Sequence, residues 1–152
     1  MSMNDTSVVL RPSRWLSPRT TSLITKLALL CVLVGIFYLS LTPSYSATVM
    51  SFEGADKIKH AFAYCVLGLT TFVALPQRYF VMTLTGFWVM SGGIELLQGT
   101  QVERHASFYD WLANLTGLGL AYGVSLVYKK HRTAQRALCA TLIGGALFSR
   151  KQ

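Results

Sequence analysis

The sequence predicts an all-α fold, a polytopic membrane bundle of four transmembrane helices plus a short C-terminal apolar helix. Three observations lead to this prediction. Of the 152 residues, 52% are hydrophobic and only 13% are charged, whereas soluble domains carry roughly 25% charged residues. The apolar residues gather into segments of about 20 residues, a length that crosses a bilayer core of ~30 Å as a helix. The basic residues stand beside these segments and near the chain ends, where they act as topology signals.

The first span is expected to follow a basic leader at residues 1–21. Leu23–Leu41 is apolar apart from Lys26, and Pro43 follows it, so this segment is predicted to cross the membrane. The small residues of Ser44–Ala47 also fit a signal-peptide cleavage point. Because the apolar run exceeds that of a typical signal peptide, we favour a retained anchor.

The next two spans are predicted to form a helical hairpin. The apolar run Ala61–Leu75 is too short to span alone, but a helix that starts near Asp56 has about 20 residues and does suffice. Pro76 is expected to stop this helix in a tight turn. Tyr79–Leu97 then forms the third span.

The fourth span is predicted at Trp111–Tyr128, where the basic run Lys129–Arg132 is expected to end it sharply. The last apolar piece, Ala137–Phe148, is short for a span, so we expect it to lie at the interface or to pack on the bundle. The expected organisation is a basic cytoplasmic leader (1–21), a transmembrane domain (22–128) and a basic tail with a short apolar helix (129–152).

The distribution of charge predicts the orientation. The positive-inside rule places the leader, the turn at Arg78 and the basic stretch Lys129–Arg136 in the cytoplasm. The expected location is therefore a bacterial inner membrane, crossed several times, with both termini cytoplasmic. The net charge of +8 could also suggest nucleic-acid binding. We exclude that partner because no basic helix or patch with interleaved aromatic residues is present.

Seven polar residues interrupt the apolar segments, and alternation of the spans brings all of them to the outer membrane face. They are Asp56, Lys57, His60, Glu95, Gln98, Asp110 and Asn114. Ionisable residues in membrane segments are costly, so their presence indicates function by default. Some have structural explanations when taken alone. Asp56 suits a helix N-terminus, and Ser107 with Asp110 forms a capping-box pattern.

Glu95 resists a structural explanation. It lies near the C-terminal end of its helix, where the helix dipole disfavours an anion, and its neighbours are apolar. A buried carboxylate needs a cationic partner, a proton or a ligand. Topology brings His60, Lys57 and Arg104 to the same end, and Gln98 shares the helix face of Glu95. We therefore predict a functional polar pocket.

Small residues are expected to let the helices around this pocket approach closely. These glycines are Gly86, Gly92, Gly93, Gly117, Gly119 and Gly123. The three cysteines are isolated, which argues against a disulfide framework or a thiolate metal site. Asp56, His60, Glu95 and Asp110 are conceivable metal ligands. With one histidine on the spans a zinc site would be atypical, so we expect no metal and no cofactor.

These motifs, in this order, resemble those of the VanZ-like family of bacterial integral membrane proteins. The matching segments are Asp56–Tyr64 with Leu67-Gly68, then Glu95–Gln98, then Arg104–Ser107 with Asp110 and Asn114–Gly117. The resemblance covers roughly residues 25–128. It implies a membrane fold and a link to the cell envelope, because the best-known member is associated with resistance to a lipoglycopeptide antibiotic and relatives with exopolysaccharide functions. It implies no established reaction.

Two functions remain open for the predicted pocket. The first is a membrane-embedded enzyme that acts on a lipid-linked or phosphate-bearing envelope precursor. Its expected catalytic residues are Glu95, His60 and Asp110, and its expected substrate-binding residues are Asp56, Lys57, Gln98, Arg104, Ser107 and Asn114. The second is a non-catalytic accessory or binding subunit of an envelope-polysaccharide or antibiotic-resistance system. A proton-coupled carrier is disfavoured, because four spans without internal repeats do not suit one.

Overall fold

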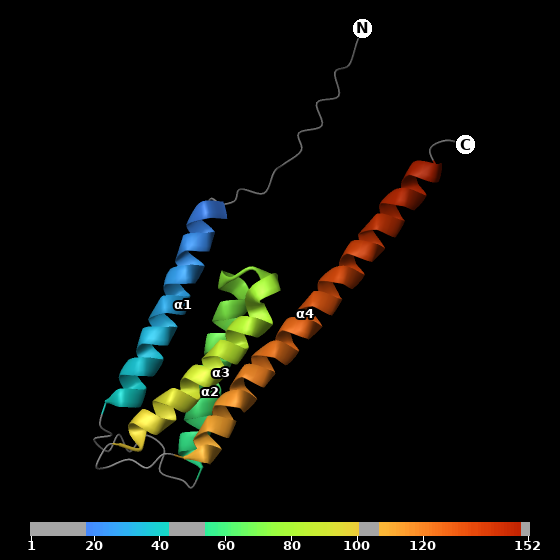
Figure 1. Cartoon of the computed structure of the whole chain (residues 1–152). Helices are drawn as coiled ribbons and strands as arrows, with labels where there is room; N and C mark the ends of the chain where they lie inside the picture. Colours follow the sequence, from blue (N-terminus) through green and yellow to red (C-terminus); the bar gives the residue numbers. More distant parts are fainter. Residues whose placement is uncertain (1–17, 43–53, 101–106, 150–152) are drawn as a thin grey trace.

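The protein is all-helical over the residues that the structure, a computed structural model, describes: 18–42, 54–100 and 107–149. Its elements are α1 (Pro18–Leu41), α2 (Ala55–Ala74), the 3-10 turn η1 (Gln77–Tyr79), α3 (Phe80–Gln98) and α4 (Phe108–Ser149). Successive helices run in alternating directions (Figure 1). The starts of α2 and α4 therefore lie at the same end of the molecule as the ends of α1 and α3.

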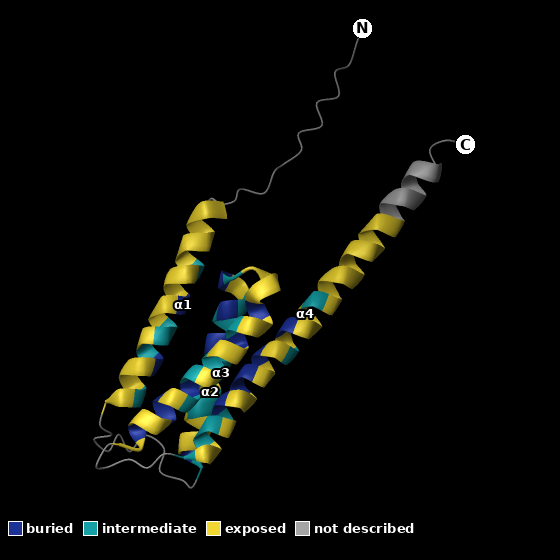
Figure 2. Ribbon diagram, viewed as in Figure 1, coloured by how far each residue is buried: buried dark blue, intermediate teal, exposed yellow. Residues whose placement is uncertain are grey.

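Helix α1 contains the whole predicted segment Leu23–Leu41 but begins earlier, at Pro18. Proline suits the first helical position because its fixed φ is helical and its missing N–H would have no partner there. The last four residues of the expected leader, 18–21, therefore belong to α1. Residues 1–17 lie outside the described part of the chain. Helix α1 packs on α2 and α3 but is largely exposed, with Leu29 and Ile36 as its buried residues (Figure 2).

The helices predicted on either side of the turn at Pro76 are present as α2 and α3. Helix α2 begins at Ala55 and ends at Ala74. Leu75, which precedes Pro76, is extended, as the clash with a following proline ring requires. The side-chain amide of Gln77 donates to the carbonyl oxygen of Phe72 at 2.9 Å and closes the turn.

Helix α4 corrects the predicted C-terminal region. The expected sharp end at Lys129–Arg132 is wrong, because α4 continues without a break to Ser149. The segment Ala137–Phe148 is thus the last part of α4 and not a separate helix. Lysine, arginine, alanine and glutamine are good helix formers, and no glycine or proline interrupts residues 129–136. Residues 130–141 are exposed and extend away from the other helices (Figures 1 and 2), which contradicts the expected packing on the bundle.

The closest helix contact joins α2 to α4. A Cβ atom at Gly117 would overlap the backbone carbonyl of Ala61 and lie 2.9 Å from the backbone nitrogen of Cys65. A Cβ atom at Gly68 would lie 2.5 Å from that of Ala121. The absence of two side chains therefore sets the separation of α2 and α4.

The glycine prediction is confirmed for only two of its six residues. Gly117 makes the contact just described, and Gly92 makes room for Trp111, whose Nε1 would lie 3.1 Å from an added Cβ. The other four have no such neighbour within 4 Å: Gly86, Gly93, Gly119 and Gly123. Spacing along one helix does not say which glycine faces a neighbouring helix.

Two helical segments, Pro18–Leu41 and Gln77–Gln98, are long and apolar enough to cross a membrane. In their most apolar stretches only 11% and 28% of the residues are buried inside the bundle. Large apolar side chains are also exposed on the other helices, for example Phe62 on α2 and Val127 on α4. Contiguous exposed apolar surface is typical of a face that meets lipid or a partner, so these features indicate a membrane protein.

The substitution Gly117→Ala is expected to lower the free energy of unfolding by about 1–3 kcal/mol, because the added methyl overpacks the α2–α4 contact. Thermal unfolding in detergent, followed by circular dichroism, measures this effect. The matched control is Gly119→Ala, where the added methyl meets no atom within 4 Å and the better helix propensity of alanine, up to ~1 kcal/mol, leaves stability unchanged or raised. Equal unfolding temperatures for the two variants would contradict the assigned contact.

Candidate functional site

The structure brings six of the predicted polar residues together at the end where α2 and α4 begin and α3 ends. His60 follows Asp56 by four residues and Lys57 by three, and Asn114 follows Asp110 by four, so each of these pairs shares a helix face. We call this set the polar cluster: Asp56, Lys57 and His60 from α2, Glu95 from α3, and Asp110 and Asn114 from α4. The predicted convergence of the three motifs is therefore confirmed for these residues.

His60 is the centre of the polar cluster. Its Nδ1 lies 3.2 Å from Oδ1 of Asn114 and 3.9 Å from Oε1 of Glu95. Its Nε2 lies 3.8 Å from Oδ2 of Asp56, whose side chain is exposed. Because Oδ1 of Asn114 is the acceptor within hydrogen-bond distance of the ring among the described residues, the ring proton of a neutral His60 belongs on Nδ1, where it is donated to Asn114. Nε2 then carries the lone pair and faces the outside of the bundle.

Glu95 is the most deeply placed charge of the cluster. Only 7% of its side chain is exposed, and its Oε1 has no hydrogen-bond partner among the residues that the structure describes. The carboxylate accepts a hydrogen bond from the backbone N–H of Ser107. One hydrogen bond and a histidine at 3.9 Å do not replace the water that a carboxylate loses on burial. Glu95 is therefore poised to take up a proton or to interact with a cation or a ligand.

Lys57 and Asp110 form a loose ion pair at the edge of the cluster. Nζ of Lys57 lies 3.9 Å from Oδ1 of Asp110, and the side chains are 50% and 13% exposed. Oδ1 of Asp110 is buried and has no hydrogen bond to any of the described residues. A half-exposed pair at this distance is worth little in stability, so the ammonium of Lys57 is free to meet an anion.

Ser107 has a structural role that the sequence predicted. Its Oγ accepts a hydrogen bond from the backbone N–H of Asp110 at 3.3 Å, and α4 starts at the residue after Ser107. This is the N-terminal half of a capping box, which satisfies a free backbone donor of the first turn. The cap also positions the Ser107 backbone beneath Glu95.

The structure does not bring Gln98 to the polar cluster. The residue is buried, but its Nε2 donates to the carbonyl oxygen of Ser40 at 2.7 Å. Ser40 lies in the last turn of α1, where carbonyls lack helical partners. Gln98 therefore ties α3 to α1. Arg104, the other predicted binding residue on this side, lies outside the described residues.

Two residues that were not predicted as site residues extend the cluster inward. Tyr64, only 3% exposed, lies one turn below His60, and its hydroxyl hydrogen-bonds to the side chain of Ser91. Ser91 lies one turn before Glu95 and is fully buried. The spacing of four residues from Asp56 to His60 to Tyr64 places all three on one helix face, which is the signal that identifies Tyr64.

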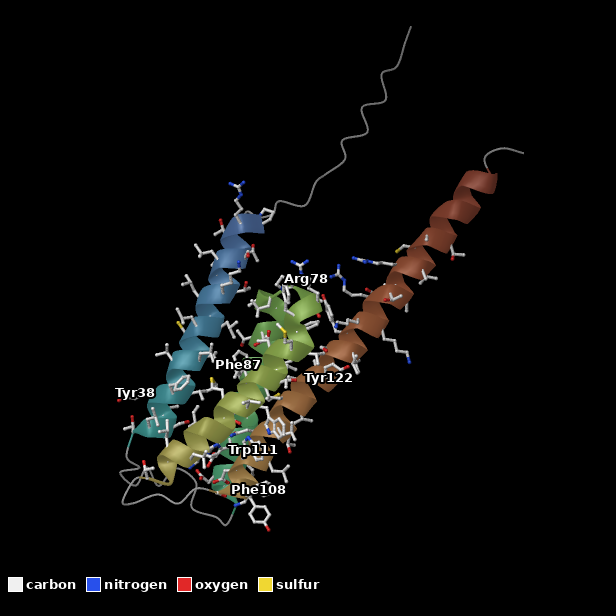
Figure 3. All side chains as sticks on the ribbon, viewed as in Figure 1. Tyr38, Arg78, Phe87, Phe108, Trp111 and Tyr122 are labelled. Carbon is white, nitrogen blue, oxygen red and sulfur yellow. The ribbon has the colours of Figure 1, made fainter. Side chains whose placement is uncertain are left out.

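A tryptophan pair fixes the first turns of α4 against α3. The rings of Trp88 and Trp111 stack with centroids 4.6 Å apart, and Nε1 of Trp111 donates to the carbonyl oxygen of Trp88 at 3.0 Å. Figure 3 shows Trp111 near the start of α4, close to Phe108. This contact holds Asp110 and Asn114 beside Glu95.

Comparison of the chain with protein-family models, curated proteins and solved structures gives no match. The resemblance to the VanZ-like family therefore remains a prediction, which rests on the sequence motifs given above. The chemistry open to the cluster follows from its own groups: a buried carboxylate, an imidazole, an amide, a half-exposed ammonium and two further carboxylates.

Replacing Gln98 with alanine is expected to lower the free energy of unfolding by about 0.5–1.5 kcal/mol, because one hydrogen bond between α3 and α1 is lost. Chemical unfolding in detergent measures the change. The control is Thr100→Ala, since Thr100 is exposed and its hydroxyl donates to the carbonyl oxygen of Leu97 in the last turn of α3. A Gln98→Ala protein of unchanged stability that no longer bound ligand would show instead that Gln98 belongs to the site.

Proposed function

We propose that this chain is a VanZ-like protein of four membrane spans that binds a lipid-linked or phosphate-bearing cell-envelope precursor and acts on it by acid–base chemistry. The observation that carries the proposal is Glu95, a carboxylate with only 7% of its side chain exposed, beside His60, whose Oε1 has no hydrogen bond within the described part of the chain. A buried charge without full compensation is typical of functional sites.

The helix lengths and the ends of the bundle support a four-span arrangement. Helix α2 has 20 residues, which gives about 30 Å at ~1.5 Å per residue. Arg78 lies at the end opposite to Phe108 and Tyr38 (Figure 3), and Lys129 lies over the rings of Phe72 and Phe80 near the same turn. By the positive-inside rule this basic end is cytoplasmic, and the polar cluster then faces the outside.

The polar cluster offers separate groups for binding and for proton transfer. Lys57 can form a charge-assisted contact with a phosphate oxygen. Glu95 acts as the general acid or base, because its unpartnered Oε1 can accept or release a proton. His60 and Asn114 fix the surroundings of that carboxylate, and Asp110 positions Lys57.

The accessory role remains the second candidate, for a specific reason. The polar cluster contains no hydroxyl or thiol group that could serve as a nucleophile, and the nearby hydroxyl of Ser107 is engaged in the helix cap. A subunit that only holds an anionic lipid headgroup for other envelope machinery needs Lys57 and the cluster but no turnover.

Binding and turnover of a long-chain polyprenyl diphosphate by the protein in nanodiscs test the proposal. Lys57→Ala is expected to weaken binding about 10-fold or more, because a hydrogen bond to a charged group contributes about 1.5–3 kcal/mol. The control is Lys130→Ala, which should bind the lipid as the wild type does. Lys130 is an exposed lysine of residues 130–141 of α4, which we call the α4 extension. Glu95→Gln should retain lipid binding and lose turnover, which phosphorus NMR of the lipid measures.

The binding and turnover experiments have two outcomes that would contradict the proposal in different ways. A wild type that does not bind the lipid, or Lys57 and Lys130 variants with equal affinity, would contradict the headgroup site. Binding by both wild type and Glu95→Gln without turnover in either would favour the accessory role.

A further inference from the structure

Three residues of the polar cluster have the arrangement of metal ligands. Asp56, His60 and Asp110 each offer one ligand atom, and these atoms all lie within 4.8 Å of one another. Atoms that surround one ion at the usual bond lengths of about 2.0–2.6 Å are separated by distances of this order. Small adjustments of the side chains would therefore bring all three onto a common ion.

The surroundings of His60 also fit a ligand. A histidine that binds a metal through one nitrogen almost always donates the other N–H to a carbonyl or carboxylate. Here Nδ1 faces Oδ1 of Asn114 at 3.2 Å and Glu95 at 3.9 Å. The lone pair of Nε2 then faces a carboxylate oxygen of Asp56 at 3.8 Å. Two lone pairs that face each other are unfavourable unless a proton or a metal cation lies between them.

Glu95 adds a further carboxylate beside His60 that little compensates. Its side chain is more than nine-tenths buried, its Oε1 has no hydrogen-bond partner among the described residues, and this atom lies 3.9 Å from Nδ1 of His60. The six cluster residues carry three carboxylates against a single ammonium, that of Lys57. With His60 neutral, the excess is two negative charges, which one divalent ion would balance.

The phosphate of the proposed substrate is a further reason to expect a cation at this site. A phosphate that reached Lys57 would also meet the carboxylates of Asp110 and Asp56, which repel it. A divalent ion removes this repulsion, because Mg²⁺-type sites are commonly completed by one or two carboxylates together with the phosphates of the substrate. The ammonium of Lys57, on a half-exposed side chain, can turn from Asp110 to the phosphate when the ion binds.

We propose that Asp56, Nε2 of His60 and Asp110 bind a divalent cation of the Mg²⁺/Mn²⁺ class, and that this ion holds the phosphate of the precursor. Carboxylate ligands in excess of imidazole favour these ions over zinc or copper. The ion site rests on the proposed function only for the identity of the bound phosphate. Asn114 and Glu95 lie at Nδ1, on the side of the ring away from the ion, and orient the histidine.

Electron paramagnetic resonance of Mn²⁺, titrated into the purified full-length protein in detergent, tests the site. The wild type is expected to bind one Mn²⁺ per chain. His60→Ala and Asp110→Asn should weaken binding by at least about 10-fold, the smallest loss typical of metal-site substitutions. The matched control is His131→Ala, an exposed histidine on the α4 extension, which should bind as the wild type does.

The substitutions are chosen so that the protein stays folded, and folding is checked for each variant. Asp110→Asn preserves side-chain volume, and the helix cap uses the backbone N–H of Asp110 and not its carboxylate. Circular dichroism and gel filtration confirm that each variant is folded before the titration. No bound Mn²⁺ in the wild type, or equal affinity in His60→Ala and His131→Ala, would overturn the ion site.

A second titration separates this proposal from the proposed function. Polyprenyl diphosphate binding is measured in EDTA and again after Mn²⁺ is restored, with an expected loss of about 10-fold or more in EDTA. Binding of equal strength in EDTA would overturn the ion site and leave the headgroup proposal standing. Mn²⁺ binding without lipid binding would support the ion site and overturn the headgroup proposal.

Discussion

The close approach of α2 and α4 is the constraint on which the rest of the structure depends. Gly117 lies against the backbone of Ala61 and Cys65, and any side chain at this position would push the helices apart. Ala61 follows His60, and Asn114 lies one turn before Gly117. The 3.2 Å contact between His60 and Asn114 is thus a direct consequence of a missing side chain. Stacking of Trp111 on Trp88 then brings α3 and Glu95 to the same place.

The polar cluster lowers the free energy of unfolding of the helix bundle in which it lies. Glu95 lies in the last turn of α3, where the helix dipole disfavours an anion, and its burial removes solvating water. A structural residue would gain nothing from this position, since an apolar side chain would pack there at no electrostatic cost. Retention of three carboxylates around one imidazole is understandable when a ligand completes the site. The phosphate headgroup and the divalent ion that we propose are two parts of that completion.

Signals that act within a few residues made much of the fold predictable. The start of α2 near Asp56, the turn at Pro76 and the cap at Ser107 all follow from local chemistry, and alternation of the helices then gathered the polar motifs at one end. Other features depend on neighbours that a single chain does not reveal. Gln98 shares a helix face with Glu95 but bonds to α1. Basic residues mark a membrane boundary, so the run from Lys129 predicts the end of a helix, yet such residues favour the continuation of the helix itself.

Native mass spectrometry of the protein, released in mild detergent from the membranes in which it was made, tests most directly whether the polar cluster is a ligand site. The expected result is a wild type that carries a phosphate-bearing lipid, an additional mass that is lost in His60→Ala and kept in His131→Ala. A wild type that carries no phosphate-bearing lipid, or a lipid retained equally by both variants, would contradict it. The cluster would then be a polar contact between helices and not a binding site.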